Sequence, residues 1–194
     1  MTDLGPDWIP DEEGIPHRRA ARVIVFAPDG RILLIHGHDG HGVHHQWWFT
    51  VGGGIEPGEA PEECAIRELF EETGIKADTL SLVGPVLSRK AEFVFLNVRA
   101  RQDELFFLLF LSSWPKAINP GKLTKMEEQL LDQTVWLLPS EITKLSETED
   151  VYPSGLGEMS ASWWSGWDGV CKHICEGESS TKKSRAANDA TSGL

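Results

Sequence analysis

The segment at residues 58–74, GEAPEECAIRELFEETG, predicts a helix with an unusual density of acid. Ala60 to Thr73 contains no glycine, its only proline stands at the second position, and Gly74 follows its end. Proline early and glycine late is the normal asymmetry of a helix. Apolar residues at helical spacing supply a buried stripe, which consists of Ala65, Ile66, Leu69 and Phe70. The segment has six glutamates among its seventeen residues, and most of them lie in the predicted helix. The fold must therefore bury one face of a strongly acidic helix.

Three of these glutamates share one face of the predicted helix, because residues i, i+3 and i+4 lie together. They are Glu68, Glu71 and Glu72. Like charges this close weaken a helix. A hard cation such as Mg²⁺ or Mn²⁺, which prefers oxygen ligands, would offset the repulsion. A solvated acidic face is the ordinary interpretation of such a run, but the glycine-rich segment before the helix favours a metal site.

Apolar runs on both sides of this helix predict strands. Residues 21–27 and 31–35 flank Pro28-Asp29-Gly30, which is a hairpin signal. A short strand from Trp47 leads into a glycine-rich turn at residues 52–54. Further strands are expected at 81–88, 92–99, 104–111 and 134–138, a short helix at 141–145, and a final helix around Trp163, Trp164 and Trp167 that packs on the sheet. This mixed order predicts an α/β fold with layers around a central mixed sheet.

The length of 194 residues suits a single domain. We expect a loose acidic arm at 1–16, a folded domain at 17–175, and a disordered tail at 176–194, where the residues become small and polar. The first residues lack the apolar run of a signal peptide, and no stretch approaches the roughly eighteen apolar residues of a membrane span. Three cysteines, an odd number, argue against a disulfide-stapled secreted domain. The expected location is the cytoplasm, with no membrane partner.

The formal net charge of -12 bears on the class of ligand. Binding to polymeric nucleic acid relies on clustered Lys and Arg against the phosphate backbone, so this acidic chain is not expected to bind it. A small phosphorylated ligand stays compatible with the charge, because a bound metal ion can invert the local field.

The acidic segment resembles the Nudix box, the signature of the Nudix hydrolase family. That pattern is Gly, five residues, Glu, seven residues, and then Arg-Glu-aliphatic-any-Glu-Glu-any-Gly-aliphatic. Every fixed position is matched here, by Gly53, Glu59, Arg67, Glu68, Leu69, Glu71, Glu72, Gly74 and Ile75. Nine fixed positions over twenty-three residues make this a specific match. With lower specificity, the resemblance extends over about residues 18–145, and Val51 departs from the proline that is usual in the family.

The resemblance implies a Nudix-type α/β/α sandwich and metal-dependent hydrolysis of a nucleoside diphosphate linked to another group. Glu68 and Glu72 would be the first Mg²⁺ or Mn²⁺ ligands, with Glu71 and the backbone carbonyl of Gly53 as further ligands. Arg67 would pair with Glu59 and hold the turn against the helix, which is an orienting role. The general base is left open between Glu68 or Glu71 in the box and Glu127, which a later family pattern picks out before Trp136.

Contacts to the substrate are less constrained. Trp48 could stack on a base or belong to the core, and Gln102 and Glu104 could bind polar substrate groups or face solvent. Five histidines between His36 and His45 are most simply a polar loop, with a phosphate contact or a second metal site as alternatives. The sequence leaves open which nucleotide is the substrate. It also leaves open whether the protein forms a homodimer.

Two other classes of function compete with hydrolysis. One is a catalytically silent Nudix-like module that senses a nucleotide without cleaving it. The other is an acidic protein that only binds divalent cations, which would not need Gly53, Arg67 and Gly74 at their positions. A complete box favours the enzyme.

Overall fold

The computed structural model describes residues 4–5, 7–38, 46–95, 98–121 and 131–177. The elements in chain order are β1 (Ile9–Pro10), β2 (Pro16–Phe26), β3 (Ile32–His38), β4 (Gln46–Phe49), β5 (Val51–Gly54), α1 (Pro61–Thr73), the short 3-10 helix η1 (Thr79–Ser81), β6 (Val83–Phe95), β7 (Val98–Phe110), β8 (Leu131–Leu137), α3 (Pro139–Leu145), β9 (Asp150–Tyr152), α4 (Leu156–Ser165) and β10 (Lys172–Glu176).

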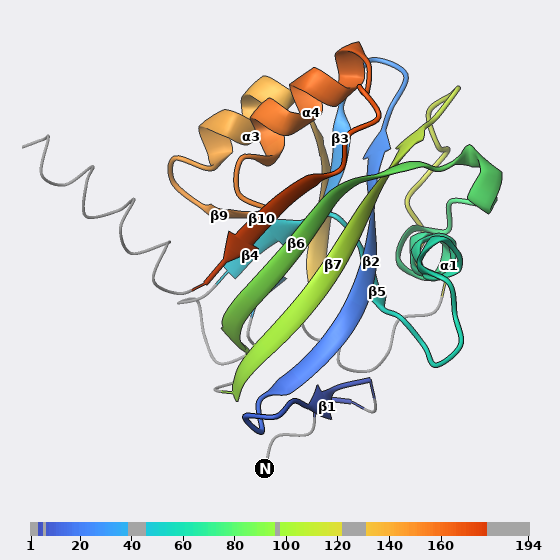
Figure 1. Ribbon diagram of the computed structural model, residues 1–194. Coiled ribbons are helices and arrows are strands. Elements are labelled where there is room, and N and C mark those ends of the chain that lie inside the picture. Colours follow the sequence, from blue (N-terminus) through green and yellow to red (C-terminus); the bar gives the residue numbers. More distant parts are fainter. Residues whose placement is uncertain (1–3, 6, 39–45, 96–97, 122–130, 178–194) are drawn as a thin grey trace, which may run out of the picture.

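The described strands form one mixed sheet built around β2 (Figure 1). Its main order is β10-β6-β7-β2-β3-β4-β9, while β1 and β5 pair with β2 and β8 pairs with β3. Strand β2 runs parallel to β7 and antiparallel to β3 and β5. The long strand β2 therefore links the short, glycine-rich β5 to β7 and, through β7, to β6 and β10.

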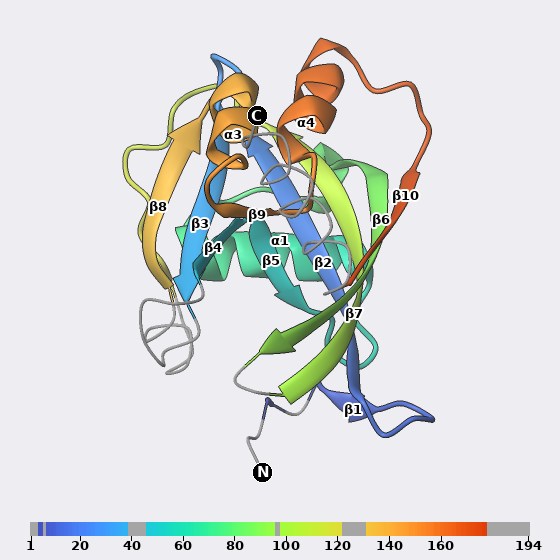
Figure 2. The ribbon, with the colours of Figure 1, turned by 90° about the vertical axis from the view of Figure 1, so that its left-hand side faces the viewer.

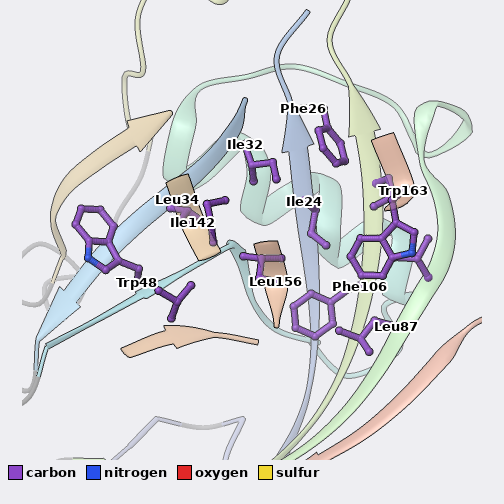
Figure 3. Packing of buried hydrophobic residues seen from close by; sticks show 13 residues of the cluster. Ile24, Phe26, Ile32, Leu34, Trp48, Leu87, Phe106, Ile142, Leu156 and Trp163 are labelled. Atoms are coloured by element: carbon purple, nitrogen blue, oxygen red, sulfur yellow. The ribbon is translucent and has the colours of Figure 1, made fainter. Parts of the chain in front are cut away.

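Helices cover both faces of the sheet, so the predicted α/β class with helices on either side is confirmed (Figure 2). Alternate residues of β2 divide the core, because successive side chains of a strand point to opposite faces. Val23 packs with α1, whereas Ile24 and Phe26 pack with α3 and α4. Figure 3 shows this second cluster, in which Ile142 of α3 and Leu156 of α4 meet the sheet.

The predicted hairpin after the first long strand is present. Phe26 pairs with Ile32 across β2 and β3. The turn between them is closed by the N–H of Gly30, which donates to the carbonyl of Ala27 at 2.9 Å. Gly30 has φ of +85°, a backbone conformation that favours glycine.

Two predicted strand boundaries are wrong. The expected strands 81–88 and 92–99 are one strand, β6, up to Phe95, and Arg99 belongs to β7. Arg89 lies between the two expected strands, and it is buried and paired with Glu104 within β6. The turn expected at residues 52–54 lies later as well. These glycines form strand β5 against β2, and Ile55 donates from its backbone N–H to the carbonyl of Arg19.

The two ends of the expected domain also differ from the prediction. Strand β1 lies within the arm expected to be loose and pairs Ile9 with His17 of β2. Helix α4 ends at Ser165, before Trp167, and the unpredicted strand β10 follows it and pairs in parallel with β6. Strand β10 ends at Glu176, which was assigned to the disordered tail. Residues 178–194 of that tail lie outside the described residues.

All three cysteines are free thiols. None of the helices in the described part of the chain has the length and apolar character needed to cross a membrane.

Candidate active site

Helix α1 places the acidic face because both of its ends are fixed locally. Ala60 precedes the helix, and its backbone N–H donates to the carboxylate of Glu63 at 3.0 Å. Pro61 occupies the first turn, where its missing N–H costs nothing. Gly74 ends the helix in the left-handed conformation and donates to the carbonyl of Phe70 at 2.8 Å. The helix predicted at 60–73 is therefore confirmed.

Glu68 and Glu72 lie on the buried side of α1 and face β5. They are 7% and 5% exposed. Glu72 accepts a hydrogen bond from the backbone N–H of Gly52 to Oε2 at 2.9 Å. Glu68 lies so close to Gly53 that a Cβ at position 53 would stand 2.5 Å from its Oε1. Glycine at 53 therefore leaves the space that the Glu68 carboxylate fills.

Arg67 ties this arrangement together. Its guanidinium binds both carboxylate oxygens of Glu59, at 2.8 and 3.0 Å, and the carbonyl of Gly54 at 2.9 Å. It also donates to Glu68 at 2.6 Å and to Glu71 at 3.2 Å. The contact with Glu59 was predicted from the box, while the bonds to Glu68 and Glu71 are additional. Arg67 therefore joins the loop before α1, the end of β5 and the acidic face.

Charge balance follows from these bonds. The hydrogen bonds from Arg67 lower the pKa of Glu59 below its usual value, although partial burial opposes the change. The same contact with Glu59 raises the pKa of Arg67, with a smaller contribution from the charge of Glu68. The loop and helix thus meet through fully charged groups.

The donor set fits a hard divalent cation. It offers the carboxylate oxygens of Glu68, Glu71 and Glu72 together with backbone carbonyls of β5, and Mg²⁺ and Mn²⁺ favour such oxygens. Within the described residues, no three His, Cys, Asp or Glu side chains are already gathered as a metal centre. Glu68 and Glu71 instead share Nη1 of Arg67. Each of these bonds engages one oxygen of its carboxylate, so a cation at this face would share Glu68 and Glu71 with Arg67 or compete with it for them.

Cys64 is a neighbour that the sequence did not identify. Its buried thiol lies 3.5 and 3.4 Å from the carbonyl oxygens of Gly53 and Gly54, to which it can donate. Burial, and then the nearby charges of Glu68 and Glu59, raise the pKa of Cys64 to about 12. The thiol is therefore protonated at neutral pH and supports the β5 backbone rather than supplying a thiolate ligand.

Gln102 and Glu104 were substrate-binding candidates with solvent exposure as the alternative, and the structure excludes the alternative. They are 2% and 1% exposed on β7. Glu104 accepts from Arg22, Arg89 and Gln102. Burial alone would raise the pKa of Glu104, but the charges of Arg22 and Arg89 outweigh it and hold the pKa at about 2. The carboxylate is charged and fully engaged, which leaves little surface for a nucleotide.

Trp48 lies on the side of the sheet opposite to the acidic face of α1. Trp48 belongs to the core cluster with α3 and α4, its indole N–H donates to Glu149 at 2.7 Å, and its ring contacts the buried ring of His36. Of the other candidates, Glu127 and three of the five histidines (His41, His44 and His45) lie outside the described residues.

Arg22 is a second residue of this region that the sequence did not identify. It donates from Nη1 to the carbonyl oxygens of Thr50 and Gly52, at 2.9 and 3.2 Å, and so contacts the same strand as the acidic face. One signal was available: Arg22 is a charged residue within the apolar run 21–27.

The chain is also similar to known proteins. A family model described as the NUDIX domain matches residues 16–154. The RNA pyrophosphohydrolase of Bartonella bacilliformis is 34% identical over 152 residues, which cover 68% of this chain and 83% of that protein. The RNA pyrophosphohydrolase of Bartonella quintana is 37% identical over 70 residues, which cover 34% of this chain but only 40% of that relative's length.

A solved structure shares the fold. The dihydroneopterin triphosphate pyrophosphohydrolase of E. coli has a TM-score of 0.53 and 18% identity, and the match covers 75% of this chain and 93% of that one. At this identity the likeness concerns the arrangement of the elements alone.

Proposed function

The chain belongs to the Nudix hydrolase family, and on that premise we propose that it hydrolyses the pyrophosphate bond of a nucleoside diphosphate linked to another group. The observation that carries the proposal is the pair of buried carboxylates, Glu68 and Glu72, one turn apart on α1 and facing β5. Two buried acids on one helix face would repel each other, and a bound cation removes that repulsion.

The roles follow from where each group lies. Glu68 and Glu72 would hold Mg²⁺ or Mn²⁺, with Glu71 and the carbonyl of Gly53 as further ligands. When bound, such a cation neutralises phosphate oxygens and lowers the pKa of water. Once the cation binds, it would compete with Arg67 for the Glu68 carboxylate. The two hydrogen bonds from Arg67 to Glu59 would still keep the loop in place. Arg67 is thus an orienting residue rather than a substrate ligand.

The general base is proposed among Glu68, Glu71 and Glu127. A base must reach the attacking water, and geometry takes precedence over pKa in that choice. Glu71 is the most accessible of the two box candidates, with a side chain 31% exposed against 9% for Glu68. Glu71 is therefore better placed than Glu68 to exchange a proton with solvent.

The substrate class is proposed to be a small nucleotide. Two relatives are named RNA pyrophosphohydrolase, so an RNA bearing a terminal pyrophosphate is a necessary comparison. The net charge of -12 opposes extended contact with an RNA backbone. A cytoplasmic location belongs to this proposal as an expectation.

A substrate panel with and without metal tests the proposal. Purified protein is incubated with nucleoside triphosphates, ADP-ribose, nucleotide sugars, dinucleoside polyphosphates and a 5′-triphosphorylated RNA, in Mg²⁺, in Mn²⁺ and in EDTA. We expect hydrolysis of at least one small nucleotide that EDTA abolishes. Tight nucleotide binding without turnover would indicate the sensor, and metal binding without nucleotide binding would indicate a simple cation-binding protein. Preferential cleavage of the RNA would overturn the small-nucleotide assignment alone.

A further inference from the structure

Gly52 of β5 is held from both faces of the sheet. On one face, Glu72 of α1 accepts a hydrogen bond from its N–H. On the other, Arg22 donates to its carbonyl and to that of Thr50. Arg22 points away from α1, because Ala21, its neighbour on β2, packs in the cluster with α1. Two charged side chains therefore fix one glycine peptide at the candidate metal site.

The lack of a side chain at position 52 leaves room for the Arg22 side chain. Arg22 and Gly52 are opposite each other in the pairing of β2 with β5. A Cβ at position 52 would lie 2.8 Å from Cγ of Arg22, and still closer to the β2 backbone. Gly52 also has φ of +140°, which side-chain-bearing residues rarely adopt. The neighbouring Gly53 leaves room for Glu68 in the same way. The glycines of β5 thus make space for side chains on both faces.

Arg22 is anchored by a row of alternating charges across the sheet. Glu104 on β7 accepts from Nε of Arg22 and from Nη1 of Arg89 on β6. Arg89 in turn donates from Nε to Glu176 on β10 at 2.6 Å. The four residues lie on adjacent strands, β2, β7, β6 and β10. Two positive and two negative charges balance, so the row can be buried without a net charge.

Stability alone is a weak explanation for this row. The cost of removing charges from water offsets much of their attraction, and apolar residues of similar volume often replace buried ion pairs without loss. Arg22 and Arg89 share Glu104, but their other hydrogen bonds differ. Those described for Arg89 lead to Glu176, whereas those of Arg22 lead to the carbonyls of Thr50, just before β5, and of Gly52 in β5.

We propose that Arg22 is a positioning residue, which fixes the backbone at Gly52 and Gly53 in the place that a cation bound by Glu68 and Glu72 requires. Glu104 holds the guanidinium of Arg22 in the orientation that reaches the carbonyls of Thr50 and Gly52. The inference rests on the proposed function, because it takes Glu68 and Glu72 as cation ligands.

Binding of Mn²⁺ alone to the metal-free full-length protein tests this role, with free Mn²⁺ measured by electron paramagnetic resonance. Arg22→Lys keeps the charge but cannot reproduce the planar fork that serves Glu104 and two carbonyls. It should weaken Mn²⁺ affinity about 10–100-fold, the usual effect of losing a group that orients metal ligands. Arg89→Lys is the matched control, because it has the same partner and similar burial, and it should change affinity less than about threefold. Thermal unfolding verifies that both variants are folded at the assay temperature.

A second variant covers the case in which Arg22→Lys does not fold. The double change Arg22→Met with Glu104→Gln removes the pair together, so no buried charge is left alone, and Arg89 keeps Glu176. It should show the same loss of Mn²⁺ affinity. Wild-type affinity in the folded Arg22 variants, or equal losses in Arg22→Lys and Arg89→Lys, would overturn the positioning role. Failure of the proposed function looks different: Glu72→Gln would then bind Mn²⁺ as wild type does.

Discussion

The carboxylate of Glu72 accepts a hydrogen bond from the backbone N–H of Gly52 at 2.9 Å, across twenty residues of sequence. This contact fixes helix α1 against strand β5. Arg67 makes a second connection between the same elements through the carbonyl of Gly54. Both contacts attach the acidic face to the glycine strand, so changes to Arg67 or Glu72 should alter the geometry of the candidate metal site.

Arg67→Gln should lower kcat/KM about 10–100-fold, as expected for a residue that orients metal ligands. The change removes the fork that binds both oxygens of Glu59 and the Gly54 carbonyl. Steady-state kinetics on the best substrate of the panel measures the effect. Arg99→Gln is the control, since Arg99 is 56% exposed and pairs with Glu92 away from α1. Equal effects of the two changes would contradict an orienting role for Arg67.

Glu104 should contribute stability that is lost in acid. Its pKa is about 2 in the folded protein against a usual value of 4.5, so between these values the unfolded chain takes up a proton that the folded chain does not. The contribution is present above about pH 4.5 and falls as the pH drops toward 2. The groups that face Glu104 are Arg22, Arg89 and Gln102.

The contribution of Glu104 is measured by urea unfolding from pH 6 to pH 2. The wild type is compared with the double variant Arg22→Met, Glu104→Gln. The difference in free energy of unfolding between the two proteins should be constant above about pH 4.5 and shift against the wild type below it. A difference that does not vary with pH would show that the pKa of Glu104 is not depressed.

Truncation should be tolerated after Gly177 but not after Cys175. The shorter chain lacks Glu176, which pairs with Arg89 and accepts from the backbone N–H of Ser154. Loss of Glu176 leaves the buried Arg89 with less compensation and should cost about 1–3 kcal/mol. Residues after 177 lack large apolar side chains apart from the terminal leucine. Thermal and urea unfolding of the two truncated chains measure the difference, and equal stability would argue against a role for Glu176.

Glu127→Gln should lower kcat about 10²–10⁴-fold if Glu127 is the general base. The position is set by the family resemblance and lies outside the described residues. Mn²⁺ binding to the free protein should hardly change, because Glu68 and Glu72 hold the cation. Glu128→Gln is the neighbouring control and should be much milder. Wild-type kcat in both variants would return the search for the base to Glu68 and Glu71.

Local signals in the sequence were sufficient for the helix of the site. Pro61, Gly74 and the apolar stripe all lie within the helix or at its ends, so the expected range of 60–73 agrees with α1. The contact between Arg67 and Glu59 was also predicted, from the resemblance to the Nudix box, and it joins the loop before α1 to the helix.

Long-range pairing explains the errors. Glu104 was considered as a substrate contact or a solvent-facing residue, and its ion pair was not foreseen, because its partner Arg22 lies 82 residues earlier and neither residue reveals the other. Strand β10 has no strong strand pattern of its own and pairs with β6, where Cys175 lies opposite Lys90. Arg89 lies between the expected strands 81–88 and 92–99, and β6 continues through it because its neutralising partners come from β7 and β10. Such elements are set by tertiary contacts rather than by local propensity.

Hydrolysis of the best nucleotide of the panel by wild type and by Glu72→Gln, each in saturating Mg²⁺ and in EDTA, tests metal-dependent catalysis at the α1 face most directly. Glutamine keeps an oxygen that can accept from Gly52 but loses the charge that a cation needs. Because a bound cation supplies several kcal/mol of transition-state stabilisation and about 1.4 kcal/mol corresponds to tenfold in rate, turnover should fall at least about 10²-fold. Wild-type protein should lose its activity in EDTA and regain it with Mg²⁺. Full turnover by a folded Glu72→Gln variant in saturating Mg²⁺ would contradict the assignment of this face as the catalytic metal site.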